Sequence, residues 1–293
     1  MLFRSRAKSG TFRTADVVGL DTLGHVIRTM QDKLPGDPFH PIYKTPGALE
    51  KLIAEGSLGQ KSGAGFYKKV GKDILRYDAA KHDYVPSATK ADELVGRILK
   101  EKDPAKRLKS LRESTNPQAQ FLWAIFRDAF HYIAVHLESI ADTARDVDFA
   151  LRWGFGWKQG PFELWQLAGW QQVAQWVKQD IDEGHALSNA SLPDWVFDGR
   201  SAVHTEQGSW SPKKKSYVAR SALPVYQRQV FRASLVGEYV ASGATAGTTV
   251  HEDASVRLWH QDDDVLVLSF KTKLHVMGPE VIAGIEQIGR AHV

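Results

Sequence analysis

The chain has 293 residues, of which 43% are hydrophobic and 25% charged, so it suits about two globular domains and not a disordered chain. It contains no cysteine, which excludes disulfides, zinc–thiolate sites and a cysteine nucleophile. The net charge is only +4, no apolar run approaches the ~20 residues of a membrane span, and the start lacks a signal-peptide core, so a cytoplasmic protein is expected.

The first third of the chain predicts helices and a small hairpin. Residues 10–34 repeat apolar side chains every three to four positions and predict one helix, which Asp21 can cap. A second helix is expected at about 46–56, with Pro46 at its first helical position. The run at 74–77 suggests a hairpin. Residues 87–116 are charged and predict a helical connector that packs through four aliphatic side chains, Leu94, Ile98, Leu108 and Leu111.

The middle of the chain predicts a longer helical series. A helix at 117–140 presents a 3.6-residue apolar stripe of Phe121, Ile125, Ala129, Tyr132, Ile133, His136, Leu137 and Ile140. A shorter helix is expected to start at Asp146 and to end at 154–156. Gly160 and Pro161 then predict a turn into a short helix anchored by Phe162 and Trp165, and 170–182 predicts another helix.

Beyond residue 190 the pattern changes to strands and turns. Short β-like runs occur at 216–220 and 225–227, and 243–247 is interpreted as a flexible break. Residues 255–260 and 265–270 predict a β-hairpin, followed by a helix over 279–288. Because one hairpin and one helix cannot bury a core, we expect this last domain to be truncated.

One ten-residue motif occurs twice, 150 positions apart. Gly10-Thr11-Phe12 leads to Gly19, and Gly160-Pro161-Phe162 leads to Gly169, with the glycines and the phenylalanine in register. Both copies precede a helical pattern. The motif therefore predicts an internally duplicated helical domain.

The candidate chemical sites favour structural roles. The glycine-rich stretch 59–65 matches neither a P-loop nor a dinucleotide fingerprint and is interpreted as a turn. His131 and His136 are five positions apart on one predicted helix, so they point ~140° apart and cannot share a metal; His136 is expected to be a hydrogen-bonded core histidine. The cluster Lys213-Lys214-Lys215 is interpreted as a solvated loop.

The acidic residues and the tryptophans are interpreted in the same way. Asp146 and Asp148, beside Arg145, favour a helix start, with general acid–base chemistry as the weaker alternative. The tryptophans are expected to be core residues, among them Trp153, Trp157, Trp165, Trp170 and Trp176. The sequence thus assigns no catalytic, cofactor-binding or metal-binding residue, and the substrate-binding residues stay unknown.

Taken together, these motifs resemble the C-terminal domain of the NAD-dependent 3-hydroxyacyl-CoA dehydrogenases. The stretch 59–67 is similar to that family's G-x-K-S/T-G-x-G-F-Y signature, and 148–162 is similar to its second copy. The region 256–288, above all 268–273, resembles the opening hairpin and helix of an enoyl-CoA hydratase (crotonase) domain. Two positions depart from the family pattern: Thr11 replaces a proline, and Gln166 stands where Asp is common and where the first copy keeps Asp16.

The resemblance implies a mainly α fold within a fused bacterial β-oxidation enzyme. It divides the chain into a first copy (6–78), a helical connector (79–116), a second copy (117–200), a β/turn connector (201–253) and the start of the hydratase domain (254–287). Residues 1–5 and 288–293 resemble translated sequencing adapters, so we expect a fragment. The resemblance implies that the family's catalytic residues lie outside this fragment, so we expect it to be inactive alone. Lys271 and Lys273 could meet CoA phosphates, although solvated strand-end lysines are the favoured interpretation.

The same resemblance implies the ligands and partners. NAD would be bound by an upstream domain that this chain does not contain, and the substrate would be an acyl-CoA. A homodimer through the helical domain is possible, and neither nucleic acid nor a membrane is expected as a partner. The alternative hypothesis is a non-catalytic helical binding or scaffold protein that uses its basic surface.

Overall fold

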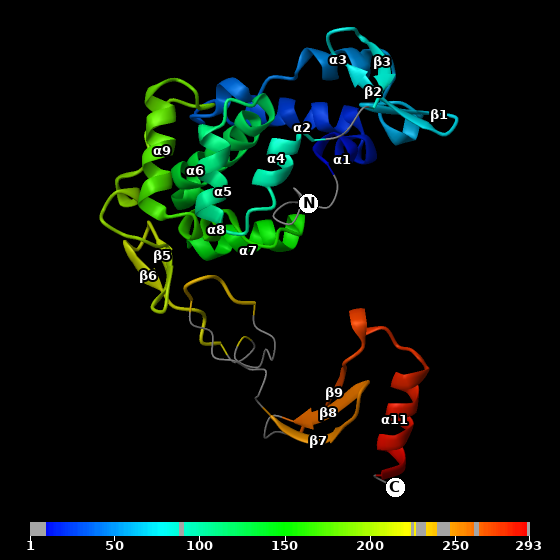
Figure 1. Cartoon of the computed structure of the whole chain (residues 1–293). Coiled ribbons are helices and arrows are strands. Elements are labelled where there is room, and N and C mark those ends of the chain that lie inside the picture. Colours follow the sequence, from blue (N-terminus) through cyan, green and yellow to red (C-terminus); the bar gives the residue numbers. More distant parts are fainter. Residues whose placement is uncertain are drawn as a thin grey trace. The chain divides into compact units, whose positions relative to one another are not determined.

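The computed structural model describes residues 10–87, 91–223, 226, 233–238, 247–260 and 264–291. The chain divides into two compact units (Figure 1). The first comprises Met1–Arg220 together with Leu235–Glu238, and the second comprises Ser221–Ser234 and Tyr239–Val293. Within the described residues the fold is mostly helical, with three small antiparallel sheets.

The first unit begins with two helices in place of the single helix predicted over 10–34. They are α1 (Thr11–Val18) and α2 (Leu20–Lys33). The prediction was wrong because Gly19 has φ 107°, which breaks the helix between them. Asp21 does not cap: it lies in the first turn of α2, with its Oδ1 2.6 Å from Lys61 Nζ, and this hydrogen bond lowers the pKa of the Asp21 carboxyl.

A compact three-stranded meander completes this region, which we call the first repeat (10–86). It follows η1 (His40–Ile42), α3 (Gly47–Ala54) and η2 (Gln60–Ser62). The strands are β1 (Tyr67–Val70), β2 (Asp73–Asp78) and β3 (Asp83–Pro86), paired antiparallel in chain order, so a third strand joins the predicted hairpin. Pro46 is the N-cap of α3, one position before the place predicted for it.

The connector between the repeats forms two short helices, α4 (Glu93–Ile98) and α5 (Pro104–Glu113). Asp92 and Asp103 cap them through hydrogen bonds from the backbone amides of Leu94 and Ala105. Leu108 and Leu111 are buried as predicted, whereas Leu94 is 41% exposed because it lies on the outer face of α4.

Two helices precede the second copy of the motif, and a third lies within it. Helix α6 (Pro117–Ile140) has the predicted bounds, although Phe121 on its predicted stripe is 64% exposed. Helix α7 (Ala144–Phe155) starts two residues before the predicted position, because Thr143 is its N-cap and Asp146 closes a capping box. Helix α8 (Pro161–Leu167) has Pro161 in its first turn, as predicted.

The remaining elements follow the order of the first repeat in part: a second helix and then a three-stranded meander, without a counterpart of α3 among the described residues. Helix α9 (Trp170–Asp182) has the predicted bounds and follows Gly169, whose φ is 95°. It leads to η3 (Asp194–Val196) and a second meander of β4 (His204–Thr205), β5 (Gly208–Ser211) and β6 (Ser216–Val218). We call residues 160–218 the second repeat.

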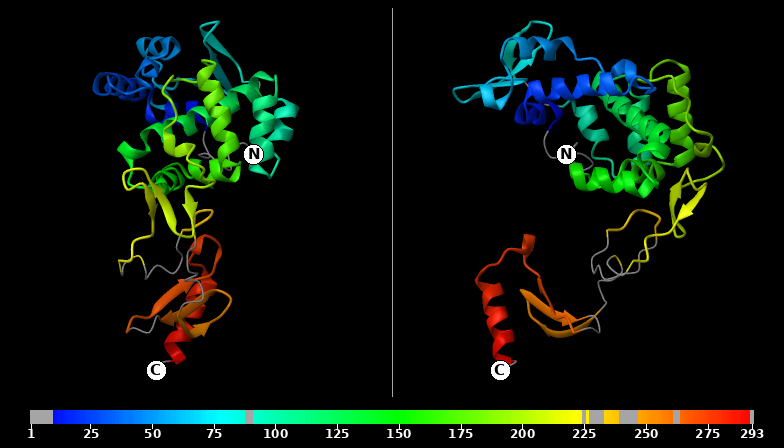
Figure 2. Two further views of the ribbon diagram at one scale, coloured as in Figure 1. Left: turned by 90° about the vertical axis from the view of Figure 1, so that its left-hand side faces the viewer. Right: turned by 180° about the vertical axis from the view of Figure 1, so that it is seen from behind.

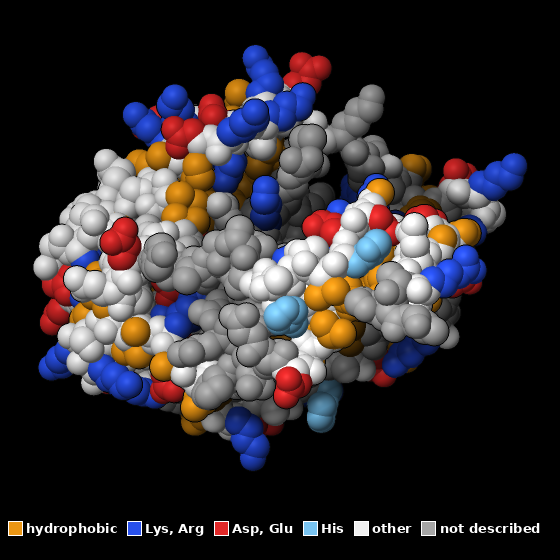
Figure 3. All heavy atoms as spheres, turned by 90° about the horizontal axis from the view of Figure 1, so that it is seen from below, with side chains coloured by type: hydrophobic (Ala, Val, Ile, Leu, Met, Phe, Trp, Pro, Cys, Tyr) orange, Lys and Arg blue, Asp and Glu red, His pale blue; other side chains and the backbone are white. Residues whose placement is uncertain are grey.

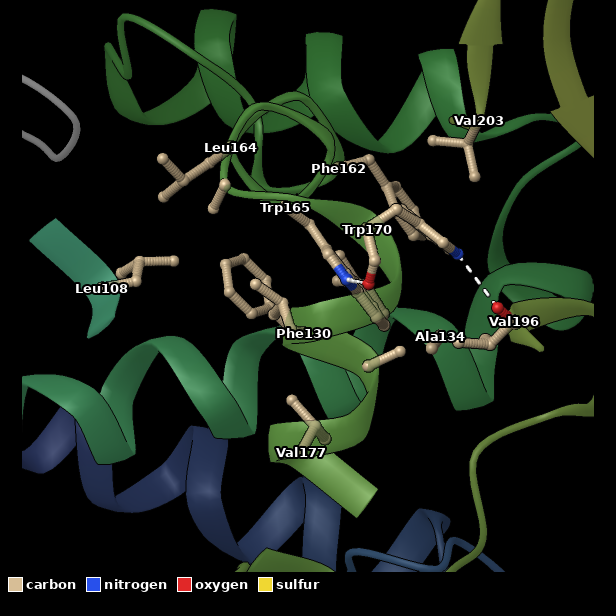
Figure 4. Packing of buried hydrophobic residues seen from close by; sticks show 14 of the residues in the cluster. Leu108, Phe130, Ala134, Phe162, Leu164, Trp165, Trp170, Val177, Val196 and Val203 are labelled. Atoms are coloured by element: carbon tan, nitrogen blue, oxygen red, sulfur yellow. Dashed lines mark hydrogen bonds between the residues drawn. The ribbon is translucent and has the colours of Figure 1, made fainter. Parts of the chain in front are cut away.

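The main core of the first unit is built on the second repeat (Figure 4). The rings of Trp165 and Trp170 stack with their centroids 4.3 Å apart. Each indole N–H finds a backbone carbonyl at 3.0 Å, that of Trp170 for Trp165 and that of Val196 for Trp170. Phe162 and Trp165 are fully buried as predicted, but Trp153 is 69% exposed near the C-terminal end of α7 and is not a core residue.

The first repeat joins this core through the loop after α2. Phe39 is 1% exposed and packs edge-on against His131 and Tyr132 of α6, with ring centroids 5.0 Å apart in each pair. The Ser188 hydroxyl donates to the Pro38 carbonyl at 2.7 Å. The two repeats therefore share one compact unit.

The second unit contains a three-stranded antiparallel sheet and one long helix (Figure 2). The predicted hairpin is β8 (Val256–His260) with β9 (Val267–Phe270), and β7 (Thr248–Glu252) adds a strand that was not predicted. After η5 (Lys273–His275), helix α11 (Pro279–Ala291) packs on the sheet where Val256 and Val281 are fully buried. The predicted run 225–227 and the break at 243–247 lie mostly outside the described residues.

None of the helices that the structure describes is long and apolar enough to cross a membrane.

Candidate functional site: the hydrogen-bonded centres of the two repeats

Asp16 forms the centre of the first repeat. Its carboxylate is 4% exposed and accepts the backbone N–H groups of Phe66 and Tyr67, at 2.7 and 2.8 Å. This joins the short helix α1 to the start of strand β1, some 50 positions later. The carboxylate is thus used for fold closure and faces no open site.

The glycine-rich stretch 59–65 packs against the same helix. A Cβ on Gly59 would lie 2.3 Å from the Asp16 carbonyl oxygen, and one on Gly65 would lie 2.2 Å from Asp16 Oδ1. The stretch forms the 3-10 turn η2, with Gly59 and Gly63 at positive φ. It is therefore a turn, as predicted. It lacks the strand–loop–helix geometry that holds a dinucleotide, so it does not fit NAD.

Gln166 performs the equivalent task in the second repeat. Its Oε1 accepts the backbone N–H groups of Val203 and His204, both at 3.0 Å, at the start of strand β4. Its Nε2 donates to the carbonyl oxygens of His204 and Val236, at 3.0 and 3.2 Å. The amide thus accepts as Asp16 does and also donates, which a carboxylate cannot do.

A chain of three buried polar side chains lies beside Gln166. His204 Nε2 is 2.8 Å from Asp148 Oδ2, and His204 Nδ1 is 2.7 Å from Ser209 Oγ. Asp148 also accepts the backbone N–H groups of Phe162 and Glu163, each at 2.8 Å. A neutral imidazole that donates from Nε2 and accepts the Ser209 hydroxyl at Nδ1 satisfies every partner, so we assign this tautomer.

The residue types match a Ser-His-Asp triad, but the setting does not. Ser209, His204 and Asp148 are all 0% exposed, and Ser209 Oγ also accepts the Arg145 backbone N–H at 3.0 Å. A nucleophile has to reach its substrate, and this hydroxyl is enclosed and already hydrogen-bonded. The network therefore fastens α7 and α8 to the second meander, and the geometry does not support an acid–base role for Asp148.

The remaining histidine and acidic candidates are also used internally. His131 is wholly buried: its Nε2 lies 2.7 Å from the Ala190 carbonyl oxygen, and burial lowers its pKa. His136, predicted to be the core histidine, is half-buried, with its Nε2 3.3 Å from Asp37 Oδ1. Asp180 lies close to Glu183 and His185 but already accepts Trp123 Nε1–H at 2.7 Å and pairs with two arginines, so it offers a metal no free carboxylate.

The lysines singled out from the sequence lie in solvent. Lys213, Lys214 and Lys215 are exposed in the turn between β5 and β6, as predicted. Lys271 is exposed and pairs with Glu252 at 2.8 Å, and Lys273 is exposed. On the face shown in Figure 3, the lysine and arginine side chains of the described residues lie among acidic ones.

One open groove was not predicted. It has a volume of about 420 Å3 and lies between α5 and the α8–α9 pair. Its lining comprises Ala105, Lys106, Lys109, Glu113, Ala168, Gln172 and Trp176, with Lys109 paired to Glu113. Its residues come from distant segments, so no local motif could have predicted it.

Comparison with known proteins agrees with this architecture. Residues 5–69 match the family model "3-hydroxyacyl-CoA dehydrogenase, C-terminal domain". The chain is 30% identical over 281 residues to "Probable 3-hydroxyacyl-CoA dehydrogenase" of Bacillus subtilis, which covers 94% of this chain and 33% of that protein. It is 42% identical over 81 residues to "Fatty acid oxidation complex subunit alpha" of Psychrobacter cryohalolentis, covering 26% of this chain and 11% of that protein. No solved structure matches it.

These findings relate the chain to the 3-hydroxyacyl-CoA dehydrogenases. Residues 5–69 carry a 3-hydroxyacyl-CoA dehydrogenase C-terminal domain, and the chain is related to 3-hydroxyacyl-CoA dehydrogenases and to fatty acid oxidation complexes. It spans about a third of the length of the Bacillus protein and less of the other relatives.

Proposed function

We propose that this chain acts within a longer bifunctional enzyme, a 3-hydroxyacyl-CoA dehydrogenase joined to an enoyl-CoA hydratase of fatty-acid β-oxidation. In that enzyme NAD accepts the hydride from C3 of a 3-hydroxyacyl-CoA, which becomes a 3-ketoacyl-CoA. The present chain supplies the two repeats, which form one wall of the acyl-CoA cleft and contribute to a subunit interface.

The observation that carries this proposal is the duplicated architecture. Asp16 and Gln166 stand at the same position of the duplicated motif and accept two consecutive backbone N–H groups at the start of a three-stranded meander. The family match covers residues 5–69, which include most of the first repeat, and the shared geometry supports the same assignment for the second repeat. The finer domain boundaries given by the sequence remain predictions.

The division of labour follows from what the described residues lack. Asp16, Asp148 and Asp180 accept hydrogen bonds within the fold, His204 is paired through both ring nitrogens, and the glycine-rich turn does not fit NAD. The reacting groups and the dinucleotide site are therefore expected in other parts of the longer enzyme. The β7–β9 sheet with α11 supports the hydratase assignment, because it has the elements of the hairpin and helix that the sequence resembles.

A bare helix face supports further polypeptide around the first repeat. Phe162 on α8 is 0% exposed, since α7 and the core cover it, whereas its counterpart Phe12 on α1 is 55% exposed. Val17 and Val18 of α1 are 62% and 55% exposed. Burial of such a face contributes roughly 25 cal/mol per Å2, so it favours packing against another part of the longer enzyme.

The direct test is NADH formation from 3-hydroxyacyl-CoA substrates of several chain lengths. The isolated chain is expected to give no turnover, and turnover by the chain alone would refute the division of labour. Retention on an acyl-CoA resin supports the proposal. Salt-sensitive binding to nucleic acid without acyl-CoA binding would instead support the non-catalytic scaffold.

A further inference from the structure

The segment Leu235–Glu238 lies on the second repeat, although the chain on both sides of it belongs to the second unit. Leu235 is 3% exposed. The Val236 N–H donates to Glu163 Oε1 at 3.0 Å, and the Val236 carbonyl accepts from Gln166 Nε2 at 3.2 Å. The segment is thus held through both its backbone and a buried side chain.

Glu238 supplies the charge of this contact. Its side chain is 1% exposed and lies between two guanidinium groups. Arg145 Nε donates to Oε1 at 2.6 Å, and Arg220 Nη2 donates to Oε2 at 2.7 Å. A buried carboxylate needs such pairing, because loss of its partners leaves an uncompensated charge.

Gly237 allows the turn to pack closely against the second repeat. It stands third in a turn closed by the Glu238 N–H and the Leu235 carbonyl at 3.2 Å, and its φ is 90°. A Cβ at this position would lie 2.3 Å from the His204 carbonyl oxygen and 2.7 Å from Gln166 Nε2. Glycine is therefore the residue that lets the turn approach strand β4.

Gln166 explains why the second repeat receives the segment. In the first repeat Asp16 accepts two backbone N–H groups and has no proton to donate. Gln166 accepts the equivalent pair and uses its NH2 group for the carbonyls of His204 and Val236. The amide that stands where the first repeat has Asp16 thus supplies a donor for the docked turn.

We propose that the second repeat carries a docking site for a tight turn of sequence Leu-Val-Gly-Glu, and that the chain's own Leu235–Glu238 is its occupant. Gln166 selects the turn, and Arg145 with Arg220 binds its carboxylate. We call this docked turn the clip. It attaches the segment that leads toward the second unit to the second repeat, and it detaches while the repeats stay folded. This inference does not depend on the proposed enzymatic function.

Hydrogen–deuterium exchange of the full chain tests the clip, read at the Val236 and Glu238 amides. Gly237→Ala and Gln166→Asp are expected to accelerate their exchange on the order of tenfold or more, since the first places a Cβ 2.3 Å from the His204 carbonyl oxygen and the second removes the donor to the Val236 carbonyl. Peptides from α8, α9 and β5 are expected to stay protected, which shows that the repeats remain folded.

Two matched controls separate docking from general strain. Gly199→Ala introduces the same change at φ 94° with no atom within 4 Å of the new Cβ. Gln172→Asp makes the same substitution at an exposed position of α9. Neither control is expected to change exchange at Val236 or Glu238. The clip is refuted if these amides are unprotected in the parent chain, if the controls act like the variants, or if the whole first unit exchanges together with the segment.

Discussion

His204 and Asp148 are 56 positions apart, yet His204 Nε2 and Asp148 Oδ2 lie 2.8 Å apart with neither side chain exposed. The contact fastens the second meander to the helix pair α7–α8, whose turn Asp148 also holds through two backbone amides. Its enclosure marks the second repeat as a rigid scaffold. We therefore expect substitutions in this network to destabilise the fold, although its residue types are those of a catalytic triad.

His204→Ala is expected to lower the free energy of unfolding of the first unit by about 3 kcal/mol or more, because it removes a charge-assisted hydrogen bond to Asp148, removes the acceptor of the Ser209 hydroxyl and leaves a cavity in place of a fully buried imidazole. Urea unfolding followed by tryptophan fluorescence measures this, since every tryptophan except Trp259 lies in the first unit. His185→Ala is the control: the side chain is 63% exposed, so a change within about 0.5 kcal/mol is expected. Equal effects of the two variants would contradict the role of the network.

The duplicated phenylalanines provide a matched pair. Phe162→Ala is expected to cost about 3–5 kcal/mol, because a fully buried ring leaves a cavity. Phe12→Ala, at the same motif position but 55% exposed, is expected to cost less than about 1 kcal/mol in the isolated chain. The same unfolding experiment compares them, and a loss from Phe12→Ala as large as that from Phe162→Ala would show that the α1 face is already covered.

Asp16→Asn replaces one of the two acceptor oxygens by an NH2 group that faces a backbone N–H. We expect the first meander to lose about 1–3 kcal/mol of local stability, the cost of leaving a buried donor unsatisfied. Amide exchange at Phe66 and Tyr67 measures it, with the exposed Asp73→Asn as the control. Unchanged exchange at both amides in the Asp16 variant would show that the anchor is dispensable.

Asp253 gives a pH prediction in the second unit. Hydrogen bonds from the backbone amides of Ser255 and Val256, and from the Ser255 hydroxyl, lower the pKa of this carboxyl from 3.8 to about 2. Since the pKa is lower in the folded state, the stabilisation is complete above pH 3.8 and is lost as the pH falls through about 2. Val256 amide exchange, corrected for intrinsic rates, is expected to rise in that window, and Asp253→Asn is expected to abolish this dependence. Persistence of the same rise in the variant would assign it to another group.

The sequence predicted the elements whose signals are local. The bounds of α6 and α9 follow from apolar periodicity and flanking turn residues, and the turn at Gly160-Pro161 follows from backbone chemistry. The split at Gly19 was missed because the apolar period continues through it. The signal for the break at Gly19 was its counterpart Gly169, which stands at the matching position of the second copy and also precedes a new helix.

The hydrogen-bonded centres could not be predicted because their partners are distant in sequence. Nothing near Asp148 indicates His204, and nothing near Gln166 indicates Val236. One signal was available: Gln166 stands where the first copy of the motif has Asp16, between glycines and a phenylalanine that match in the two copies. A change from acceptor alone to acceptor and donor indicates an extra partner, although it does not say which one.

The most direct measurement of the central claim is activity of a chimera. The chain is joined behind the region that precedes its match in the Bacillus subtilis relative, and NADH formation from 3-hydroxyacyl-CoA is compared for the chimera, the chain and that region alone. The account predicts turnover by the chimera and none by either part. A folded chimera without turnover, or turnover by that region alone at the chimera's rate, would contradict the claim that these repeats complete a 3-hydroxyacyl-CoA dehydrogenase.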